Sequence, residues 1–550
     1  MICGFEEELN LESLTLEEKV GQVFMFGFHG KHPSDATRLF EELLPGGIIY
    51  FARNTGTVEE VSALSRTLQE YASQAGSGIP LLIAADQEGG IVSRLKADIP
   101  EMPGPMALAA AVSDHDFDLV AEASRAMGVE LRAAGINMNL APVLDVNNNP
   151  ENPVIGIRSF GEDPNLVADL GVMALRGFLS AGVIPVGKHF PGHGNTSVDS
   201  HLALPVLSQS MAELDSCELI PFKAAIQANI PAIMSAHIVF QAIDSENPAT
   251  LSSAVITDLL RGNLGFGGLV ITDCLEMNAI SKYPGTPKGA VSAFKAGCDL
   301  LLISHTYEFQ KQAYFALLEA VKTGEISEHR LDDSVNRILR LKESFALPND
   351  LPSEAAHNPL FDELSRSLHI RSITVVRNEN GVIPLHPVDG ETLRICVAAP
   401  KPRRQVLVEN PVEKRNPSTS STQKSGFMTD FAASISRLCP ETEITEISMQ
   451  DPNSIEQFVS ASQRTHVTFV LSENATINED QAAFIQRASS ELPDLVLIAT
   501  KNPYDISVAP SVHTYICTYG SQPEAMEALA KVLLGLEQAT GSIPVAIGGI

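Results

Sequence analysis

The chain has 550 residues, which is too many for one compact core, so we expect two or three domains. Hydrophobic residues make up 44% of it, a composition typical of a globular protein and not of a disordered or fibrous one. The formal net charge of −29 argues against nucleic-acid binding, because so acidic a chain repels phosphate backbones.

The seven cysteines are scattered along the chain and form no CxxC pair: Cys3, Cys217, Cys274, Cys298, Cys396, Cys439 and Cys517. This odd, unpaired set predicts neither a disulfide framework nor a zinc knuckle and favours a reducing compartment. Residues 1–10 lack the basic and apolar parts of a secretory signal, and no apolar run reaches the roughly 20 residues that cross a bilayer. We therefore expect a cytoplasmic protein that makes no contact with a membrane.

The first 305 residues contain eight short apolar runs bounded by glycine, proline or polar residues: Gly21–Phe28, Gly47–Phe51, Pro80–Ala85, Ile136–Pro142, Val183–Lys188, Pro231–Ala236, Gly268–Asp273 and Cys298–Ile303. Continuously apolar runs of this length are typical of parallel strands buried on both faces. Segments with helical periodicity separate most of them: Val58–Ala75, Asp116–Ala134, Leu166–Ala181, Met211–Ala228 and Ser253–Leu260. The alternation predicts an α/β fold with an N-terminal (β/α)8 TIM-type barrel, and a doubly wound sheet is the alternative.

Polar side chains end or follow five of these runs: Asp86, Asp145, Asn147, Lys188, His189, His237 and Asp273. In barrel enzymes the carboxyl ends of the strands, and the loops after them, build the active site. We therefore expect these residues to converge on one pocket.

A stretch rich in proline and polar residues, Ala346–Pro359, marks a boundary. A helix is predicted at Leu360–Leu368, followed by six strand candidates: Ser372–Arg377, Leu393–Ala399, Glu443–Ile447, His466–Leu471, Asp494–Thr500 and His513–Thr518. We assign 1–345 to the barrel, 346–380 to a linker and 381–550 to a smaller α/β sandwich domain. Lys401–Ser425 is basic and serine-rich, and we expect an exposed, mobile excursion there.

The segment after Lys188 contains a carboxylate two residues before an imidazole, in Asp199-Ser200-His201. Across a tight turn these side chains can meet, and the carboxylate can then orient a histidine that acts as acid and base. Taken alone, such a pair is more often a surface feature. The surrounding sequence therefore has to show whether this pair is functional.

That context is the sequence Lys188-His-Phe-Pro-Gly-His-Gly194 ahead of Asp199-x-His201, which resembles the family 3 β-N-acetylglucosaminidases. The resemblance implies that the Asp199–His201 pair is the acid/base. Family 3 β-glucosidases resemble the same barrel but lack this loop pattern. The resemblance covers residues 10–380 strongly and the remainder weakly.

Further segments carry the same resemblance: Asp86-Gln-Glu-Gly-Gly with Arg94, Asn152–Asp163 with Arg158, Ser235-Ala-His237, and Thr272-Asp273-Cys-Leu-Glu-Met277. The resemblance implies that Asp273 is the nucleophile. It also implies that the following residues bind the sugar: Asp86, Arg94, Arg158, Lys188, His189 and His237. The chain departs from the family at Ile91, where arginine is common, and at Cys274, which we interpret as a packing residue.

Histidines 189, 193, 201 and 237 have irregular spacing and no HExxH helix, so the sequence predicts no metal and no cofactor. The resemblance implies a retaining exo-β-N-acetylglucosaminidase that forms a glycosyl-Asp273 intermediate. Its partners would be N-acetylglucosamine-containing saccharides, either cell-wall muropeptides or chitooligosaccharides. A phosphorylase using the same residues is one alternative, because a neutral histidine does not repel phosphate. A non-catalytic sugar-binding protein is another. The oligomeric state is not indicated.

Overall fold

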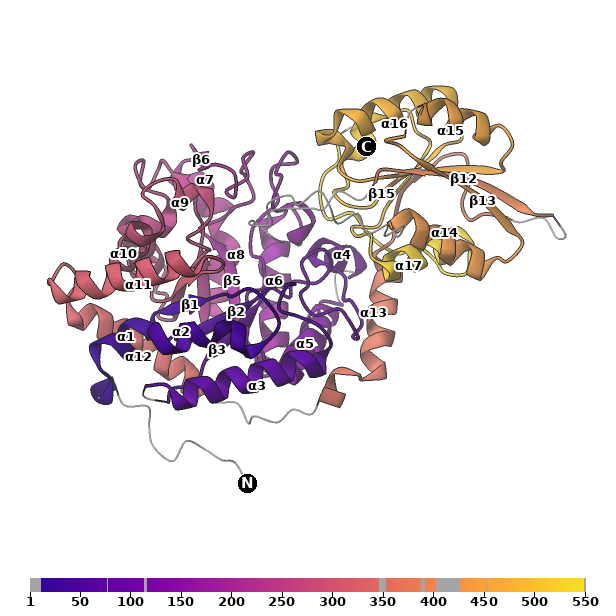
Figure 1. Cartoon of the computed structure of the whole chain (residues 1–550). Coiled ribbons are helices and arrows are strands. Elements are labelled where there is room, and N and C mark those ends of the chain that lie inside the picture. The colour runs from indigo at the N-terminus through magenta and orange to yellow at the C-terminus, as the bar shows by residue number, and fades with distance from the viewer. Residues whose placement is uncertain are drawn as a thin grey trace.

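The computed structural model describes residues 11–76, 78–112, 116–345, 353–386, 391–401, 426–451 and 453–548. Two lobes are visible in Figure 1, a barrel formed by the first part of the chain and a separate sheet domain formed by the last part. The predicted excursion at 401–425 lies outside the described residues, apart from Lys401. In the described part, no helix is both long enough and apolar enough for a bilayer crossing.

The barrel consists of eight strands that match the eight apolar runs: β1 (Phe24–Phe26), β2 (Gly47–Tyr50), β3 (Leu82–Ala85), β4 (Met138–Asn139), β5 (Ile184–Phe190), β7 (Ala232–Ser235), β9 (Leu269–Thr272) and β10 (Leu301–Ile303). Neighbours pair in parallel in the order β10-β1-β2-β3-β4-β5-β7-β9. An isolated bridge from Ile271 to Leu300 joins β9 to β10, so the barrel is nearly closed. The predicted TIM-type barrel is confirmed.

Helices surround these strands (Figure 1): α1 (Leu16–Gln22), α2 (Thr37–Glu42), α3 (Val58–Gln74), α4 (Pro105–Ala111), α5 (Asp118–Ala133), α6 (Pro164–Ser180), α7 (Met211–Ser216), α8 (Leu219–Gln227), the π-helix η5 (Ala254–Asn263), α9 (Asn278–Ser281), α10 (Thr286–Ala296), α11 (Tyr307–Lys322) and α12 (Glu328–Ser344). Helix α3 illustrates why they form. Thr57 and Glu60 make a capping box at its start, and Val61, Leu64 and Leu68 recur at helical spacing on its buried face.

One predicted helix, Met211–Ala228, is instead two helices, α7 and α8. The backbone of Cys217 leaves the helical region at φ −135° and ψ −83°. Pro221 lies in the first turn of α8, where its missing N–H costs nothing, whereas in a continuous helix it would remove a hydrogen bond. The proline therefore favours a restart of the helix at this place.

In the part of the second domain that the structure describes, six strands form one sheet: β11 (Thr374–Asn378), β12 (Leu393–Ala399), β13 (Thr442–Ser448), β14 (Val467–Ser472), β15 (Val496–Ala499) and β16 (Thr514–Cys517). Their order is β11-β16-β15-β14-β12-β13, and only the β11–β16 pair is antiparallel. The helices α14 (Phe427–Leu438) and α17 (Pro523–Leu533) cover one face, and α15 (Ser454–Ser462) and α16 (Glu479–Glu491) cover the other (Figure 1). This is the predicted α/β sandwich.

The predicted boundaries at 346 and 380 stay a prediction. Within the proposed linker, α13 (Pro359–Ser372) packs on α4, α5 and α17, and β11 is already part of the second sheet. The remaining described elements are short: η1 (Leu11–Ser13), η2 (Pro33–Ala36), η3 (Gly156–Arg158), β6 (Val206–Leu207), β8 (Val239–Phe240), η4 (Ala249–Leu251), η6 (Ser353–Ala356), η7 (Ala475–Ile477) and η8 (Asp505–Val508).

The second domain packs on the barrel beside the loop that carries Arg158. Met106, Ala107 and Ile157 of the barrel belong to the same apolar cluster as one face of the second sheet. The backbone N–H of Ile157 donates to Asn502 Oδ1 at 3.0 Å, and Asn147 Nδ2 donates to Tyr504 Oη at 2.9 Å. The second domain therefore helps to fix the segment next to Arg158.

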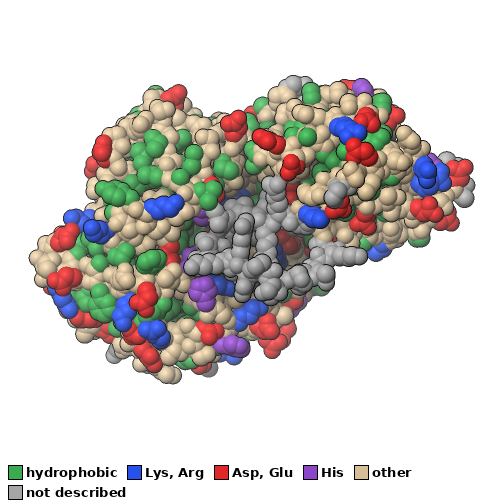
Figure 2. Space-filling model, turned by 45° about the horizontal axis from the view of Figure 1, so that its top comes forward, with side chains coloured by type: hydrophobic (Ala, Val, Ile, Leu, Met, Phe, Trp, Pro, Cys, Tyr) green, Lys and Arg blue, Asp and Glu red, His purple; other side chains and the backbone are tan. Residues whose placement is uncertain are grey.

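Acidic and basic side chains are interspersed over the face of the molecule seen in Figure 2.

Candidate active site

A cavity of about 480 Å³ lies at the carboxyl ends of the barrel strands. This volume is within the usual range of small-molecule sites. Six of the nine predicted site residues line it: Asp86, Arg158, Lys188, His189, His201 and Asp273. The other three contact residues of the cavity wall, since Arg94 pairs with Asp86, Asp199 holds His201, and His237 bonds to the carbonyl of Cys274.

A buried network of charges forms one side of the cavity. Lys188 Nζ lies 2.7 Å from Asp86 Oδ1 and 2.7 Å from Glu88 Oε1. Arg158 clamps Glu88 with two hydrogen bonds of 2.9 and 2.8 Å, and Arg94 Nη2 lies 3.3 Å from Asp86 Oδ2. Three cations thus face two carboxylates, a rigid arrangement of donors and acceptors suited to hydroxyl groups.

The network keeps its carboxylates ionised. Burial by itself would raise the pKa of Glu88, but Arg158 and Lys188 outweigh it and lower this pKa to about 2. Burial likewise opposes ionisation of Asp86, and the nearby Lys188 and Arg94 still bring its pKa below the ordinary value. For Lys188, burial favours the neutral amine, but Asp86 and Glu88 hold its pKa above the usual range. Each charge is therefore maintained by its neighbours.

Glu88→Gln should destabilise the protein, because it removes a charge that two buried cations need. The Glu88 side chain is 1% exposed, and breaking such a pair costs about 3–5 kcal/mol. The folded pKa lies below the ordinary 4.5, so this stabilisation is complete above pH 4.5 and is lost as the pH falls toward 2. Thermal unfolding should show a lower Tm for the variant than for the unchanged protein at pH 7. The difference between the two Tm values should become smaller below pH 4.5.

The matched control for that measurement is Glu70→Gln, since Glu70 is an exposed carboxylate on α3. Its Tm should equal that of the unchanged protein. A Tm for Glu88→Gln that also equals it would show that the network does not stabilise the fold.

Asp145, fully buried behind the cavity, positions His189. It accepts from the backbone N–H of His189 at 3.1 Å and from His193 N at 2.8 Å, and its Oδ2 lies 2.7 Å from His189 Nδ1. Burial opposes the charge on Asp145, but the histidines lower its pKa overall. An ionised carboxylate can only accept, so Nδ1 carries a proton and Nε2 of His189 is left for a ligand. The peptide bonds 188–189 and 190–191 are cis.

The loop from Pro191 to His201 is held from inside by its own polar groups. His193 lies 3.0 Å from both Thr196 Oγ1 and Ser200 Oγ. Asn152 Nδ2 donates to the carbonyls of His193 and Gly194 at 2.9 and 2.8 Å. A Cβ at Gly194 would overlap the carbonyl oxygen of Val146, so only glycine permits this approach. His193 therefore supports the loop from inside.

The same loop ends in the Asp199–His201 pair. Asp199 Oδ1 lies 2.8 Å from His201 Nδ1 and also accepts from the backbone N–H of His201 at 2.8 Å. The two side chains thus meet across a tight turn, the contact predicted from their two-residue spacing. Burial would raise the pKa of Asp199, but the hydrogen bonds from His201 lower it. This leaves His201 Nε2 as the atom that can exchange a proton in the cavity.

Asp273 follows directly on β9 and lines the cavity. Its Oδ1 accepts from the backbone N–H of Cys274 at 2.7 Å. Burial favours the neutral acid, yet the neighbouring His237, His189 and His201 lower its pKa below the ordinary value. His237 lies behind it, with Nε2 3.0 Å from the carbonyl oxygen of Cys274 and Nδ1 2.8 Å from Thr250 Oγ1. The arrangement provides an ionised carboxylate close to a histidine that can act as an acid.

Several residues of this site were not predicted to have a role in it. Glu88 is part of the Asp86-Gln-Glu segment, but its pairing with Lys188 joins distant parts of the chain. Asp145 was expected in the pocket from its place at a strand end, and it instead holds His189 from behind the cavity. Asn147 was expected there too, and it instead donates to Tyr504 of the second domain. His305 and Glu276 also line the cavity. His305 follows the eighth apolar run, so the strand-end argument could have found it.

The chain is similar to known proteins over most of its length. The profile of the glycosyl hydrolase family 3 N-terminal domain matches residues 15–341. A glycoside hydrolase family 3 β-N-acetylglucosaminidase structure from Paenibacillus sp. str. FPU-7 has a TM-score of 0.87 and 41% identity, covering 98% of this chain and 100% of that one. β-Hexosaminidase A of Pseudoalteromonas piscicida is 30% identical over 97% of both chains.

A solved β-glucoside phosphorylase is also similar, with a TM-score of 0.81 and 25% identity over 98% of this chain and 95% of that one. The family profile spans more than half of the chain, and the relatives match nearly its whole length. The family resemblance drawn from the sequence is therefore confirmed, and the chain belongs to glycosyl hydrolase family 3.

Proposed function

We propose that the protein is a retaining exo-β-N-acetylglucosaminidase that removes terminal N-acetylglucosamine. The observation that carries this proposal is the hydrogen-bonded Asp199–His201 pair on a loop beside the same cavity as ionised Asp273. Retaining hydrolysis needs a nucleophile and a group that first gives and then takes a proton, and this pair of sites supplies both.

In the first step, a carboxylate oxygen of Asp273 attacks the anomeric carbon while His201 Nε2 gives its proton to the departing oxygen. Asp199 accepts from Nδ1 and stabilises the charged imidazole before this transfer. The sugar is then esterified to Asp273, and the rest of the substrate leaves. In the second step, Nε2 takes a proton from water, and the water oxygen attacks the anomeric carbon and displaces the Asp273 carboxylate. Two inversions give a product with retained configuration.

The charged network is suited to hold the sugar during both steps. Asp86 can accept from hydroxyl groups, and Lys188, Arg158 and Arg94 fix its orientation directly or through Glu88. His189 offers Nε2, and His237 keeps the Asp273–Cys274 segment in place. We assign sugar binding to these residues by their place in the cavity and by the family resemblance.

For the natural substrate we favour muropeptides of the cell wall or chitooligosaccharides, and for the location the cytoplasm. The names of the similar proteins support N-acetylglucosamine as the sugar that is removed. The free state of the six described cysteines fits a reducing compartment. Cell fractionation with an antibody to the chain would test the location.

The second candidate is a phosphorylase, which the similarity to a β-glucoside phosphorylase favours. A neutral histidine in the place of a carboxylate acid does not repel phosphate, so phosphate could replace water in the second step. Hydrolysis stays the main proposal because a similar glycoside hydrolase structure is 41% identical to this chain, whereas the phosphorylase is 25% identical.

Product analysis on chitobiose and on a muropeptide, with and without phosphate, separates the two candidates. We expect free N-acetylglucosamine, first as the β-anomer in proton NMR, at the same rate in both buffers. If a sugar 1-phosphate forms when phosphate is present, the enzyme is a phosphorylase and the hydrolysis proposal is wrong. If nothing is cleaved, and nitrophenol is not released from an aryl β-N-acetylglucosaminide, the chain is a sugar-binding protein instead.

A further inference from the structure

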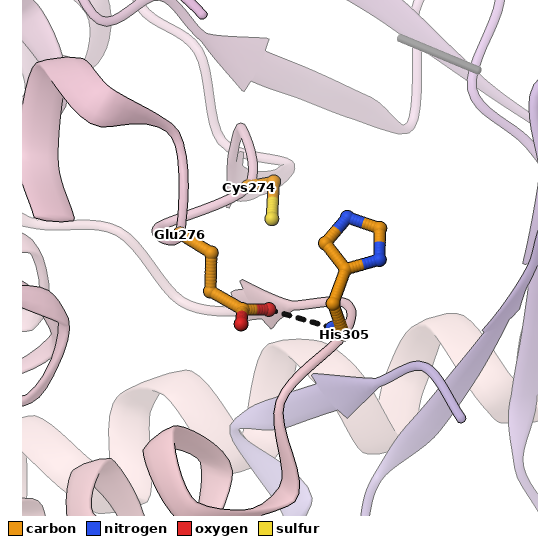
Figure 3. A group of neighbouring side chains, drawn as sticks. All are labelled: Cys274, Glu276 and His305. Atoms are coloured by element: carbon orange, nitrogen blue, oxygen red, sulfur yellow. Dashed lines mark hydrogen bonds between the residues drawn. The ribbon is translucent and has the colours of Figure 1, made fainter. Parts of the chain in front are cut away.

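Three side chains with metal-binding chemistry meet in the cavity wall, next to Asp273. They are Cys274, Glu276 and His305, and Figure 3 shows the thiol and the imidazole facing the same space above the carboxylate. One potential ligand atom from each lies within 4.8 Å of the other two. Their closeness follows from the closure of the barrel, because Cys274 and Glu276 follow β9 and His305 follows the adjacent β10.

The set of ligand atoms favours zinc. Sulfur, nitrogen and carboxylate oxygen are the three ligands of zinc in proteins, and a set of three leaves the fourth tetrahedral position open. Bonds of about 2.0–2.3 Å place such ligands roughly 3.5 Å apart. The observed group has to contract to reach that size when an ion binds.

The backbone around the group is already fixed. Glu276 accepts from the backbone N–H of His305 at 2.6 Å and of Thr306 at 3.0 Å, which ties the two strand ends together. Asp273 and His237 hold the N–H and the carbonyl of Cys274. His305 Nδ1 is buried and, within the described residues, has no hydrogen-bond partner; it lies on the side of the ring away from Cys274 in Figure 3, and a flip of the ring would bring it toward the thiol. A bound cation would supply a use for this imidazole that the hydrolysis proposal does not require.

Arg53 restricts which cation can bind. Its guanidinium donates to the carbonyls of Phe28 and Ser304, and its charge reaches His305, Cys274 and Glu276. Hard cations such as Mg²⁺ depend on oxygen ligands and would find one carboxylate here beside a positive charge. A thiophilic ion binds the thiolate of Cys274 in addition to the carboxylate of Glu276. The two negative charges together offset the positive charge of Arg53.

We propose that Cys274, Glu276 and His305 bind one thiophilic divalent cation, Zn²⁺ in the first place, and that the bound ion inhibits the enzyme by occupying the cavity beside Asp273. The binding claim does not depend on the proposed function, whereas the inhibition claim rests on it. These residues are distinct from the histidines at 189, 193, 201 and 237, for which the sequence predicts no metal.

Binding is tested with Co²⁺ on the full chain, because a cobalt–thiolate bond gives a charge-transfer absorption band. We expect a band that saturates at one Co²⁺ per chain and that Zn²⁺ abolishes by competition. Cys274→Ser should lose the band, whereas Cys439→Ser, which removes a half-buried thiol in the second domain, should keep it. Glu276→Gln should keep the thiolate band but weaken Co²⁺ binding by at least about tenfold. No band in the unchanged protein, or the same band in Cys274→Ser, would overturn the proposal.

Inhibition is tested by titrating Zn²⁺ and Mg²⁺ into the hydrolysis of an aryl β-N-acetylglucosaminide, with each variant normalised to its own activity. We expect Zn²⁺ to inhibit, a chelator to restore activity, and Mg²⁺ to have no effect. The concentration for half inhibition should rise at least about tenfold in Cys274→Ser and stay unchanged in Cys439→Ser. Inhibition that is equal in all three proteins would place the ion elsewhere. If the unchanged chain hydrolyses nothing, the proposed function fails, and the Co²⁺ band alone still decides on binding.

Discussion

Asp273→Ala should reduce kcat on chitobiose by roughly 10⁴-fold or more, because it removes the group proposed to form the covalent intermediate. The histidines around Asp273 lower its pKa, so the carboxylate is already ionised at pH values above the ordinary pKa of an aspartate. We therefore expect that Asp273 does not cause any loss of activity on the acid side near neutral pH. Steady-state kinetics on the variant, together with its Tm, measure the effect and exclude unfolding.

A chemical rescue makes the assignment more specific. Azide can enter the space left by the carboxylate and attack the anomeric carbon from the same side, which gives an α-glycosyl azide. Asp169→Asn changes an exposed carboxylate on α6 and should behave as the unchanged enzyme. Full activity in Asp273→Ala, or a β-glycosyl azide, would refute the role of Asp273.

His201→Ala should slow the cleavage of chitobiose by roughly 10²–10⁴-fold, since the departing sugar needs a proton. An activated aryl glycoside has a leaving group that departs as an anion and needs no proton. On this substrate the rate at which the glycosyl-Asp273 intermediate forms should therefore fall much less. The ratio of kcat/KM values on the two substrates therefore measures proton donation. Equal losses on both substrates would contradict a role for His201 as the acid.

Two further variants separate chemistry from structure at this loop. His329→Ala removes an exposed histidine on α12 and should leave the ratio unchanged. Asp199→Asn keeps the shape of the side chain but removes the charge that orients His201 and stabilises its charged form. Because Asp199 is proposed to position His201, its variant should shift the pH profile of kcat toward lower pH, and a merely structural role would not do so.

The barrel was predictable because its strands are apolar on both faces, which leaves a continuous apolar run in the sequence wherever a strand is buried. The runs do not give the length of each strand. Only Met138–Asn139 pairs within the predicted run Ile136–Pro142, and β5 continues through Phe190. Such ends depend on hydrogen bonds to neighbouring strands, which a local pattern does not contain.

The site was predictable to the extent that its residues stand at strand ends or in recognisable segments. The spacing of Asp199 and His201 is local, so their contact could be foreseen. The bridge from Lys188 to Asp86 and Glu88 spans about a hundred residues and depends on which strands are neighbours. Cys274 was interpreted as a packing residue, and its place beside His305 follows from the junction of the last strand with the rest of the barrel.

The packing of the second domain beside Arg158 has a consequence for anyone who wishes to shorten the protein. Cutting the chain after the barrel would expose Met106, Ala107 and Ile157 to water and remove the partners of Asn147 and of the Ile157 amide. The barrel holds the groups proposed to be catalytic, but one edge of the cavity is supported from outside the barrel. The two lobes therefore depend on each other at this edge, because each supplies apolar and hydrogen-bonding partners to the other.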